Sequence, residues 1–163
     1  MSSTSIPLTR RPSRSRGFSL IELLVVMTIL GILAAAVLPL AEVSVQRERE
    51  RDLKRALWEI RDAIDAYKHS ADAAGAAPGD THYPPTLDAL AAGVPDPKTG
   101  RTLFFLRRIP RDPFAPSDVL ASKTWGLRSY QSPADKPEPG PDVYDIFSRS
   151  ERIGLNGVPL KDW

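Results

Sequence analysis

The fold of this chain is decided by the stretch Arg16-Gly17-Phe18-Ser19-Leu20-Ile21-Glu22-Leu23-Leu24-Val25-Val26, which opens an apolar run that reaches Leu38. The run from Phe18 to Leu38 has 21 residues and a single charged side chain, that of Glu22. A helix rises about 1.5 Å per residue, so this run spans the roughly 30 Å hydrocarbon core of a bilayer. The stretch therefore predicts a membrane-spanning helix with a carboxylate inside it.

The Glu22 carboxylate is unfavourable in lipid, by about 2.5–3.5 kcal/mol at the centre of a span and by less near the interface. An acid in such a place is a functional candidate that needs a partner, and the run contains no basic side chain. If the chain is cut between Gly17 and Phe18, the new α-amino group lies one helical turn from Glu22. In a helical assembly, the amine of one subunit can then meet the carboxylate of its neighbour.

The order of residues around this junction is more specific than hydropathy alone. A basic leader is followed by Gly17, Phe18, a hydroxyl residue, leucine, and Glu22 at the fifth position after the junction. This order resembles the class III signal of type IV pilins and pseudopilins, a family that also tends to have Gly31 and Pro39. The resemblance implies cleavage between Gly17 and Phe18 by prepilin peptidase, N-methylation of Phe18, and assembly through Glu22.

An ordinary secretory signal peptide is the alternative interpretation of the same stretch. Its positive region would be residues 10–16, and its cleavage site would follow the small residues Ala34-Ala35-Ala36. The acid just inside the apolar run argues against it. So does the amphipathic helical pattern that continues after the run without a break.

Charge and composition narrow the class of protein further. The net charge is +2, but four of the 22 basic residues lie in residues 1–17 with no acid among them, which leaves 18 basic against 20 acidic residues. This balance argues against nucleic acid as a partner. The chain has no cysteine, which is compatible with an extracytoplasmic location. The arginines just before Phe18 have no acidic residue among them, and they favour an orientation with the leader in the cytoplasm and the remainder in the periplasm.

Along the chain, residues 1–17 read as a targeting segment, 18–38 as a transmembrane and assembly helix, and 39–73 as its amphipathic continuation. Pro39 cannot donate a backbone hydrogen bond, so a kink or loosening is expected there. Beyond it, apolar residues recur at intervals of four, three, four and three, which predicts one buried helical stripe. The stripe consists of Leu53, Leu57, Ile60, Ile64 and Tyr67. Charged residues occupy the opposite face: Arg55, Glu59, Asp62 and Asp65.

The run 47–52 alternates basic and acidic residues ahead of this stripe. It reads as a solvated helix face, supported by pairs such as Glu50 with Lys54. A contact between subunits of a filament is the other interpretation of the run.

Residues 74–163 are predicted to form a separate head. The small and turn-forming residues 73–80 end the long helix, and residues 86–93 read as a short helix that begins at Pro85 or Thr86 and ends at Gly93. The last 70 residues contain ten prolines, which excludes long helices. Three short strands, 102–109, 125–131 and 143–147, are expected to form a small antiparallel sheet. The fold class is therefore α+β and pilin-like, with a long N-terminal helix packed on a small sheet.

Three segments after residue 17 make the resemblance to this family more specific. These are Tyr83-Pro84, the segment 106–114 with the sequence LRRIPRDPF, and the segment 144–148 with the sequence YDIFS. They are similar to segments of the major pseudopilin of type II secretion systems, in which a tryptophan stands at the position of Phe114. That family carries a calcium-binding loop after the last strand. Here residues 149–162 hold only Glu151 and Asp162 as carboxylates, against three basic residues. Because calcium takes six to eight oxygen ligands, the chain reads as a divergent relative without the metal site.

No other chemistry is indicated by the sequence. His69 and His82 flank a flexible linker and read as surface residues, and no glycine-rich phosphate loop is present. Trp58, Trp125 and Trp163 read as core residues or docking anchors. No catalytic residue, metal or cofactor is therefore expected.

The sequence thus predicts a structural subunit of a type II secretion pseudopilus, held in the inner membrane with its head in the periplasm. Its expected partners are prepilin peptidase, other pseudopilins in homo- and hetero-assembly, and the inner-membrane secretion platform. A minor pilin of a type IV pilus or DNA-uptake machine is an alternative within the class. A membrane-anchored periplasmic enzyme or binding module is an alternative from another class, and the absence of a convergent polar cluster weighs against it.

Overall fold

The computed structural model describes residues 18–75, 80–96 and 99–163. The chain forms two compact units, Met1–Glu42 and Val43–Trp163. The predicted leader, residues 1–17, lies outside the described residues, and so does most of the predicted linker after the long helix.

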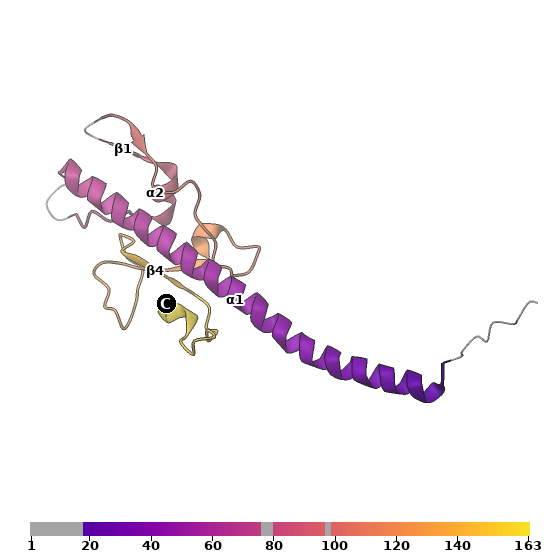
Figure 1. Ribbon diagram of the computed structural model, residues 1–163. Coiled ribbons are helices and arrows are strands. Elements are labelled where there is room, and N and C mark those ends of the chain that lie inside the picture. The colour runs from indigo at the N-terminus through magenta and orange to yellow at the C-terminus, as the bar shows by residue number, and fades with distance from the viewer. Residues whose placement is uncertain (1–17, 76–79, 97–98) are drawn as a thin grey trace, which may run out of the picture. The chain divides into compact units, whose positions relative to one another are not determined.

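A single long helix, α1, runs from Leu20 to Ala74 (Figure 1). Its ends lie within two residues of those predicted from the apolar pattern. The helix is continuous through position 39, so the loosening expected at Pro39 does not interrupt it. Among the described residues, α1 is the one helix long and apolar enough to cross a membrane, and its most apolar window has a mean hydropathy of 2.7 with none of it buried.

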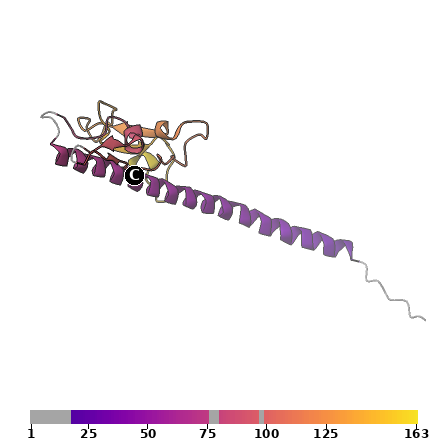
Figure 2. The same ribbon diagram turned by 90° about the horizontal axis from the view of Figure 1, so that it is seen from above.

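In the second unit, the predicted stripe of α1 forms one wall of the hydrophobic core. Leu53, Ile60 and Ile64 are almost completely buried, and Tyr67 packs against the core from its edge. The other wall comes from the head, chiefly from Leu87, Leu90, Leu106, Trp125, Val143, Ile146 and Leu160. Figure 2 shows the head elements gathered along one side of this part of α1. Burial of this apolar surface at about 25 cal/mol per Å² is the main force that holds helix and head together.

The short helix α2, Leu87–Ala92, agrees with the prediction. Thr86 is its N-cap and its hydroxyl accepts a hydrogen bond from the Ala89 backbone N–H at 3.3 Å. Gly93 ends it with a φ of 85°, a left-handed conformation that glycine adopts at no steric cost.

Within the described residues, the strands form two two-stranded antiparallel sheets, so the prediction of one three-stranded sheet is wrong. β1 (Val94–Pro95) pairs with β2 (Thr102–Leu103), and β3 (Trp125–Arg128) pairs with β4 (Asp145–Ser148). The predicted strand 102–109 keeps only its first two residues, because the N–H groups of Phe105 and Leu106 donate to the Leu90 carbonyl of α2. Two short 3₁₀ helices complete the head, η1 (Ala121–Lys123) and η2 (Leu160–Asp162).

The three tryptophans have different environments. Trp125 is a core residue, and its indole N–H donates to the Pro110 carbonyl at 2.9 Å. Trp163 is half-buried, with the Lys54 ammonium 4.5 Å from its ring centroid. Trp58 is 70% exposed, so a core role is wrong for this residue and the docking interpretation remains.

Candidate functional site: the start of the long helix and the C-terminal loop

The first turn of α1 carries the acid singled out from the sequence. Helical hydrogen bonding begins where the Leu23 N–H donates to the Ser19 carbonyl at 3.1 Å, and Glu22 lies within the turn that this bond closes. A negative charge is favoured there by the helix dipole. Glu22 makes no ion pair with any other described residue, and Phe18, just before the helix, is 76% exposed. Gly17 lies outside the described residues.

After this first turn, the side chains that α1 exposes are mostly apolar. Large exposed side chains occupy most positions from Leu20 to Leu33. The one hydroxyl in that stretch, that of Thr28, donates to the Leu24 carbonyl at 2.7 Å, so its hydrogen is satisfied within the helix. A Cβ added at Gly31 would meet no atom within 4 Å, so a neighbouring backbone has room to approach there. Such a surface requires lipid or other helices around it.

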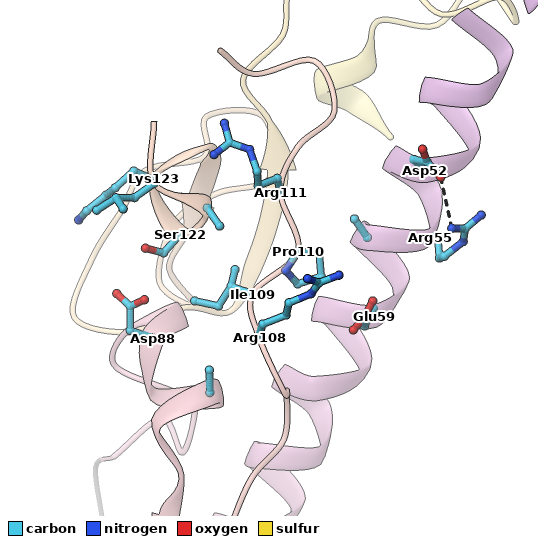
Figure 3. A pocket seen from close by; sticks show the side chains of 14 residues that line it. Asp52, Arg55, Glu59, Asp88, Arg108, Ile109, Pro110, Arg111, Ser122 and Lys123 are labelled. Carbon is cyan, nitrogen blue, oxygen red and sulfur yellow. Dashed lines mark ion pairs between the residues drawn. The ribbon is translucent and has the colours of Figure 1, made fainter. Parts of the chain in front are cut away.

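The head contains an open groove of about 900 Å³ between α1, α2 and η1 (Figure 3). Its labelled side chains are mostly charged, and Arg55 pairs with Asp52 at 3.3 Å. The residues that line the groove include no histidine or cysteine. Its one hydroxyl is that of Ser122, and its other polar side chains are carboxylates, arginines and a lysine.

The two histidines have structural contacts. His82 Nδ1 contacts a carboxylate oxygen of Asp72, and the other oxygen accepts from the Lys68 ammonium at 2.7 Å. The hydrogen bonds from Lys68 and then from His82 hold the pKa of Asp72 below its usual value. His69 Nδ1 lies 2.7 Å from the Asp65 carbonyl oxygen, one turn back along α1. Within the described ranges, no three His, Cys, Asp or Glu residues are grouped as metal ligands.

The C-terminal loop, residues 149–162, does not fit the calcium site implied by the pseudopilin resemblance. The Asn156 side-chain oxygen accepts from the Val158 N–H at 3.1 Å. The Arg152 guanidinium lies 5.4 Å from the ring centroid of Phe114, which stands at the position of the family's tryptophan. The Asn156 oxygen is thus engaged within the loop, and a cationic side chain of the loop packs on the head. This donor set offers calcium too few carboxylates and opposes it with positive charge.

Side chains of α1 hold this loop. The Glu50 carboxylate is 9% exposed and accepts hydrogen bonds from the Leu155 N–H at 2.8 Å and from the Gln46 amide at 2.9 Å. The predicted surface pair between Glu50 and Lys54 is therefore wrong, because Glu50 faces the head. Farther along the helix, the Arg61 guanidinium donates to Asp145 at 2.8 Å and to the Trp163 carbonyl at 3.0 Å. The sequence pattern does not predict these roles of Glu50 and Arg61.

Comparison of the sequence with known proteins finds a family motif and relatives. A family model described as the prokaryotic N-terminal methylation motif matches residues 12–38. The type II secretion system core protein G of Pseudomonas aeruginosa is 35% identical over 134 residues, which cover 77% of this chain and 88% of that protein. The chain belongs to the family of the type II secretion system core protein G.

Other members of the family show the same relationship. The core protein G of Aeromonas hydrophila is 30% identical over 69% of this chain and 78% of its own length. That of Klebsiella pneumoniae is 30% identical over 90% of this chain and 89% of its own length. No solved structure matches the chain. The resemblance to major pseudopilins is thus confirmed, and the family is one of structural subunits.

Proposed function

We propose that this chain is a structural subunit of a type II secretion pseudopilus that polymerises through its N-terminal helix to support protein export. The observation that carries the proposal is the exposed apolar helix with Glu22 in its first turn, behind a methylation motif. Relatives named as core proteins of this secretion system support the choice of system over a pilus.

The proposed precursor has four segments, the first of which is removed by processing. Prepilin peptidase removes residues 1–17, and Phe18 becomes the methylated N-terminus. Residues 18–38 cross the membrane, 39–73 continue the helix, and 74–163 form the head. The exposed apolar surface of α1 up to Leu40, and the charged residues that follow it, support this division.

Assembly depends on the pairing of two charges in this proposal. The α-amino group of Phe18 in one subunit meets the Glu22 carboxylate of the next, which gives the acid in the apolar run its missing partner. Desolvation cancels much of the attraction between them, so the pair contributes more to register than to net stability. The partners are other pseudopilins and the inner-membrane platform, and the head lies in the periplasm.

A deletion and complementation experiment tests this function. Removal of the gene from its native host is expected to stop export through the type II system, and the full chain supplied in trans restores it. Export unchanged by the deletion, with loss of pilus formation or DNA uptake instead, would favour a type IV pilus role. An alkaline phosphatase fused after Trp163 is expected to be active, since that enzyme requires the periplasm, and an inactive fusion would contradict the orientation.

A further inference from the structure

The head contains a second, smaller pocket of about 250 Å³, where the segment 112–124 meets the residues that follow β4. Its apolar wall consists of Phe114, Ala115, Pro116 and Val119. Its polar lining consists of Asp112, Lys123, Thr124, Arg149 and Ser150. The polymerisation proposed above uses none of these residues.

The apolar wall is fixed by hydrogen bonds within the head. The Arg111 guanidinium donates to the backbone carbonyls of Pro116 and Val119. At the start of the wall, the Phe114 N–H donates to the Asp112 carboxylate at 2.8 Å. The wall is therefore formed before a ligand arrives, which lowers the entropy cost of binding.

The polar groups of the pocket that remain unused are hydrogen-bond donors. Lys123 and Arg149 are exposed, and neither forms an ion pair in the part of the chain that the structure describes. The Ser150 hydroxyl accepts from the Arg152 N–H at 3.4 Å and donates to no described group. These three side chains call for a ligand with acceptor oxygens and negative charge.

The other two polar residues of the pocket already have partners. The Asp112 carboxylate is 2% exposed and accepts from the Ser148 hydroxyl at 2.6 Å, in addition to the Phe114 N–H. The Thr124 hydroxyl donates to the Ala121 carbonyl at 2.7 Å. The pocket thus presents two cations and a hydroxyl donor to a ligand, against one buried carboxylate.

We propose that this pocket binds the C-terminal residue of a partner polypeptide, an apolar residue whose free carboxylate contacts Lys123, Arg149 and Ser150. A terminal residue carries a carboxylate and an apolar side chain on one carbon atom, which matches the cations beside the apolar wall. The guanidinium of Arg149 is suited to a carboxylate because it can donate two parallel hydrogen bonds.

The size of the pocket favours a chain end over a chain that passes through. Pockets for drug-sized ligands have volumes of about 300–1,000 Å³, so a smaller pocket has room for about one residue. This interaction is additional to polymerisation and does not depend on it.

Peptide binding to the full chain, purified in detergent, tests the site. The probe is a fluorescein-labelled pentapeptide that ends in leucine, either with a free carboxylate or with an amide in its place. The free acid is expected to bind about tenfold more tightly, because only the acid accepts charge-assisted hydrogen bonds. A third peptide, amidated and with aspartate before the leucine, carries its charge inside the chain and should bind like the amide. Fluorescence anisotropy gives the three dissociation constants.

Variants of the pocket locate the binding. Arg149→Gln should remove most of the advantage of the free acid, whereas Arg149→Lys should retain part of it because the positive charge remains. Ala115→Leu fills the pocket without changing its charge and should abolish binding. Arg101→Gln removes an exposed charge outside the pocket and serves as the matched control, which should bind like the unmodified chain. Circular dichroism checks that each variant is folded.

Carbodiimide coupling reports the position of the bound carboxylate. The carboxylate of the free-acid peptide and the Lys123 amine are expected to condense to an amide, which mass mapping of the digested protein locates. Coupling mainly at the exposed Lys161, which does not line the pocket, would contradict the site.

The outcomes separate this inference from the proposed function. Tighter binding of the free acid, lost in Arg149→Gln and in Ala115→Leu, supports the site. Equal binding of acid and amide, binding unchanged in both variants, or no binding of the acid at about 1 mM would overturn it, although the export function would stand. Binding of the third peptide as tight as that of the free acid would overturn the assignment to a chain end.

Discussion

At the scale of single residues, Glu22 carries the clearest prediction. Its substitution by Gln or Val removes a charge from the hydrocarbon, so membrane insertion should be unchanged or improved. Filament assembly should fail, because the Phe18 amine of a neighbouring subunit loses its partner. A membrane-fraction blot measures insertion, and crosslinking or filament yield measures assembly. Normal filaments from Glu22→Val would refute the charge pairing.

Glu50 gives a second prediction at this scale, because its buried carboxylate holds the Leu155 N–H. Glu50→Ala should lower the free energy of unfolding of the second unit by about 1–3 kcal/mol, since it removes the charged acceptor of a partly buried hydrogen bond. Glu50→Gln keeps an acceptor oxygen on a side chain of the same length, so its loss in free energy of unfolding should be clearly smaller. Urea denaturation of the second unit, residues 43–163, compares the two variants. Equal losses would mean that the hydrogen bond is not the source of the stability.

The residues also differ in how far their roles could be predicted. An acid in an apolar run makes Glu22 stand out as a functional candidate, and the order of residues around Gly17 and Phe18 predicts a cleavage junction; the roles of all three stay predictions. Glu50 is hidden in a run of alternating charges, because only the position of the distant C-terminal loop turns it inward. Trp58 looks like a core residue by type, yet its place on the helix, one position beyond Leu57, turns it away from the head.

At the scale of elements, the hairpin of β3 and β4 is predicted to weaken in acid. The Asp142 carboxylate accepts from the Ser129 hydroxyl at 2.7 Å and from the Tyr130 N–H at 2.9 Å. Burial raises the pKa of Asp142, but hydrogen bonds from Thr81, Ser129 and Tyr130 outweigh burial and hold that pKa below its ordinary value. The folded state therefore binds the proton less readily than the unfolded state does.

The sign of the effect follows from this depressed pKa. Stability from Asp142 is fully present above the unfolded-state pKa of about 4 and is lost as the pH falls through the lower pKa of the folded state. Thermal melting of the head between pH 6 and pH 2.5 measures the loss. Asp142→Asn should be less stable at pH 6 and should show a shallower decline in acid. A decline as steep as that of the unmodified head would assign the acid sensitivity to other carboxyl groups.

The elements were predictable to different degrees. The helix α1 has a strong apolar period, and α2 has a capping threonine and a terminal glycine, so both agree with prediction. β1 was missed because two residues, one of them proline, carry no strand pattern. The segment after Leu103 has the composition of a strand, but its backbone hydrogen bonds go to Leu90 of α2, which no local pattern reveals.

At the scale of the whole molecule, the head is predicted to be stable without calcium. Thermal melting of residues 43–163 with calcium and then with a chelator should give nearly the same midpoint. A retained site would add about 2.7 kcal/mol at one hundred times its dissociation constant, which is a shift of several degrees. Such a shift would show that loop carbonyls and the few carboxylates suffice as ligands.

The two units of the chain correspond to two kinds of physical environment. The described part of residues 1–42 exposes apolar side chains and is suited to lipid or to other helices, whereas Val43–Trp163 has its own core and a charged surface. Family membership joins these into one account, in which a processed helix polymerises and a water-soluble head remains outside the membrane. Every step of that account depends on removal of the leader.

Intact-mass and N-terminal analysis of the protein from its native host tests that step most directly. The account predicts a mature chain that begins at N-methyl-Phe18, with residues 1–17 absent. A chain that begins at Val37 would indicate an ordinary signal peptide. A chain that keeps its leader would indicate a permanent membrane anchor. Either result would contradict the pseudopilin assignment of this subunit.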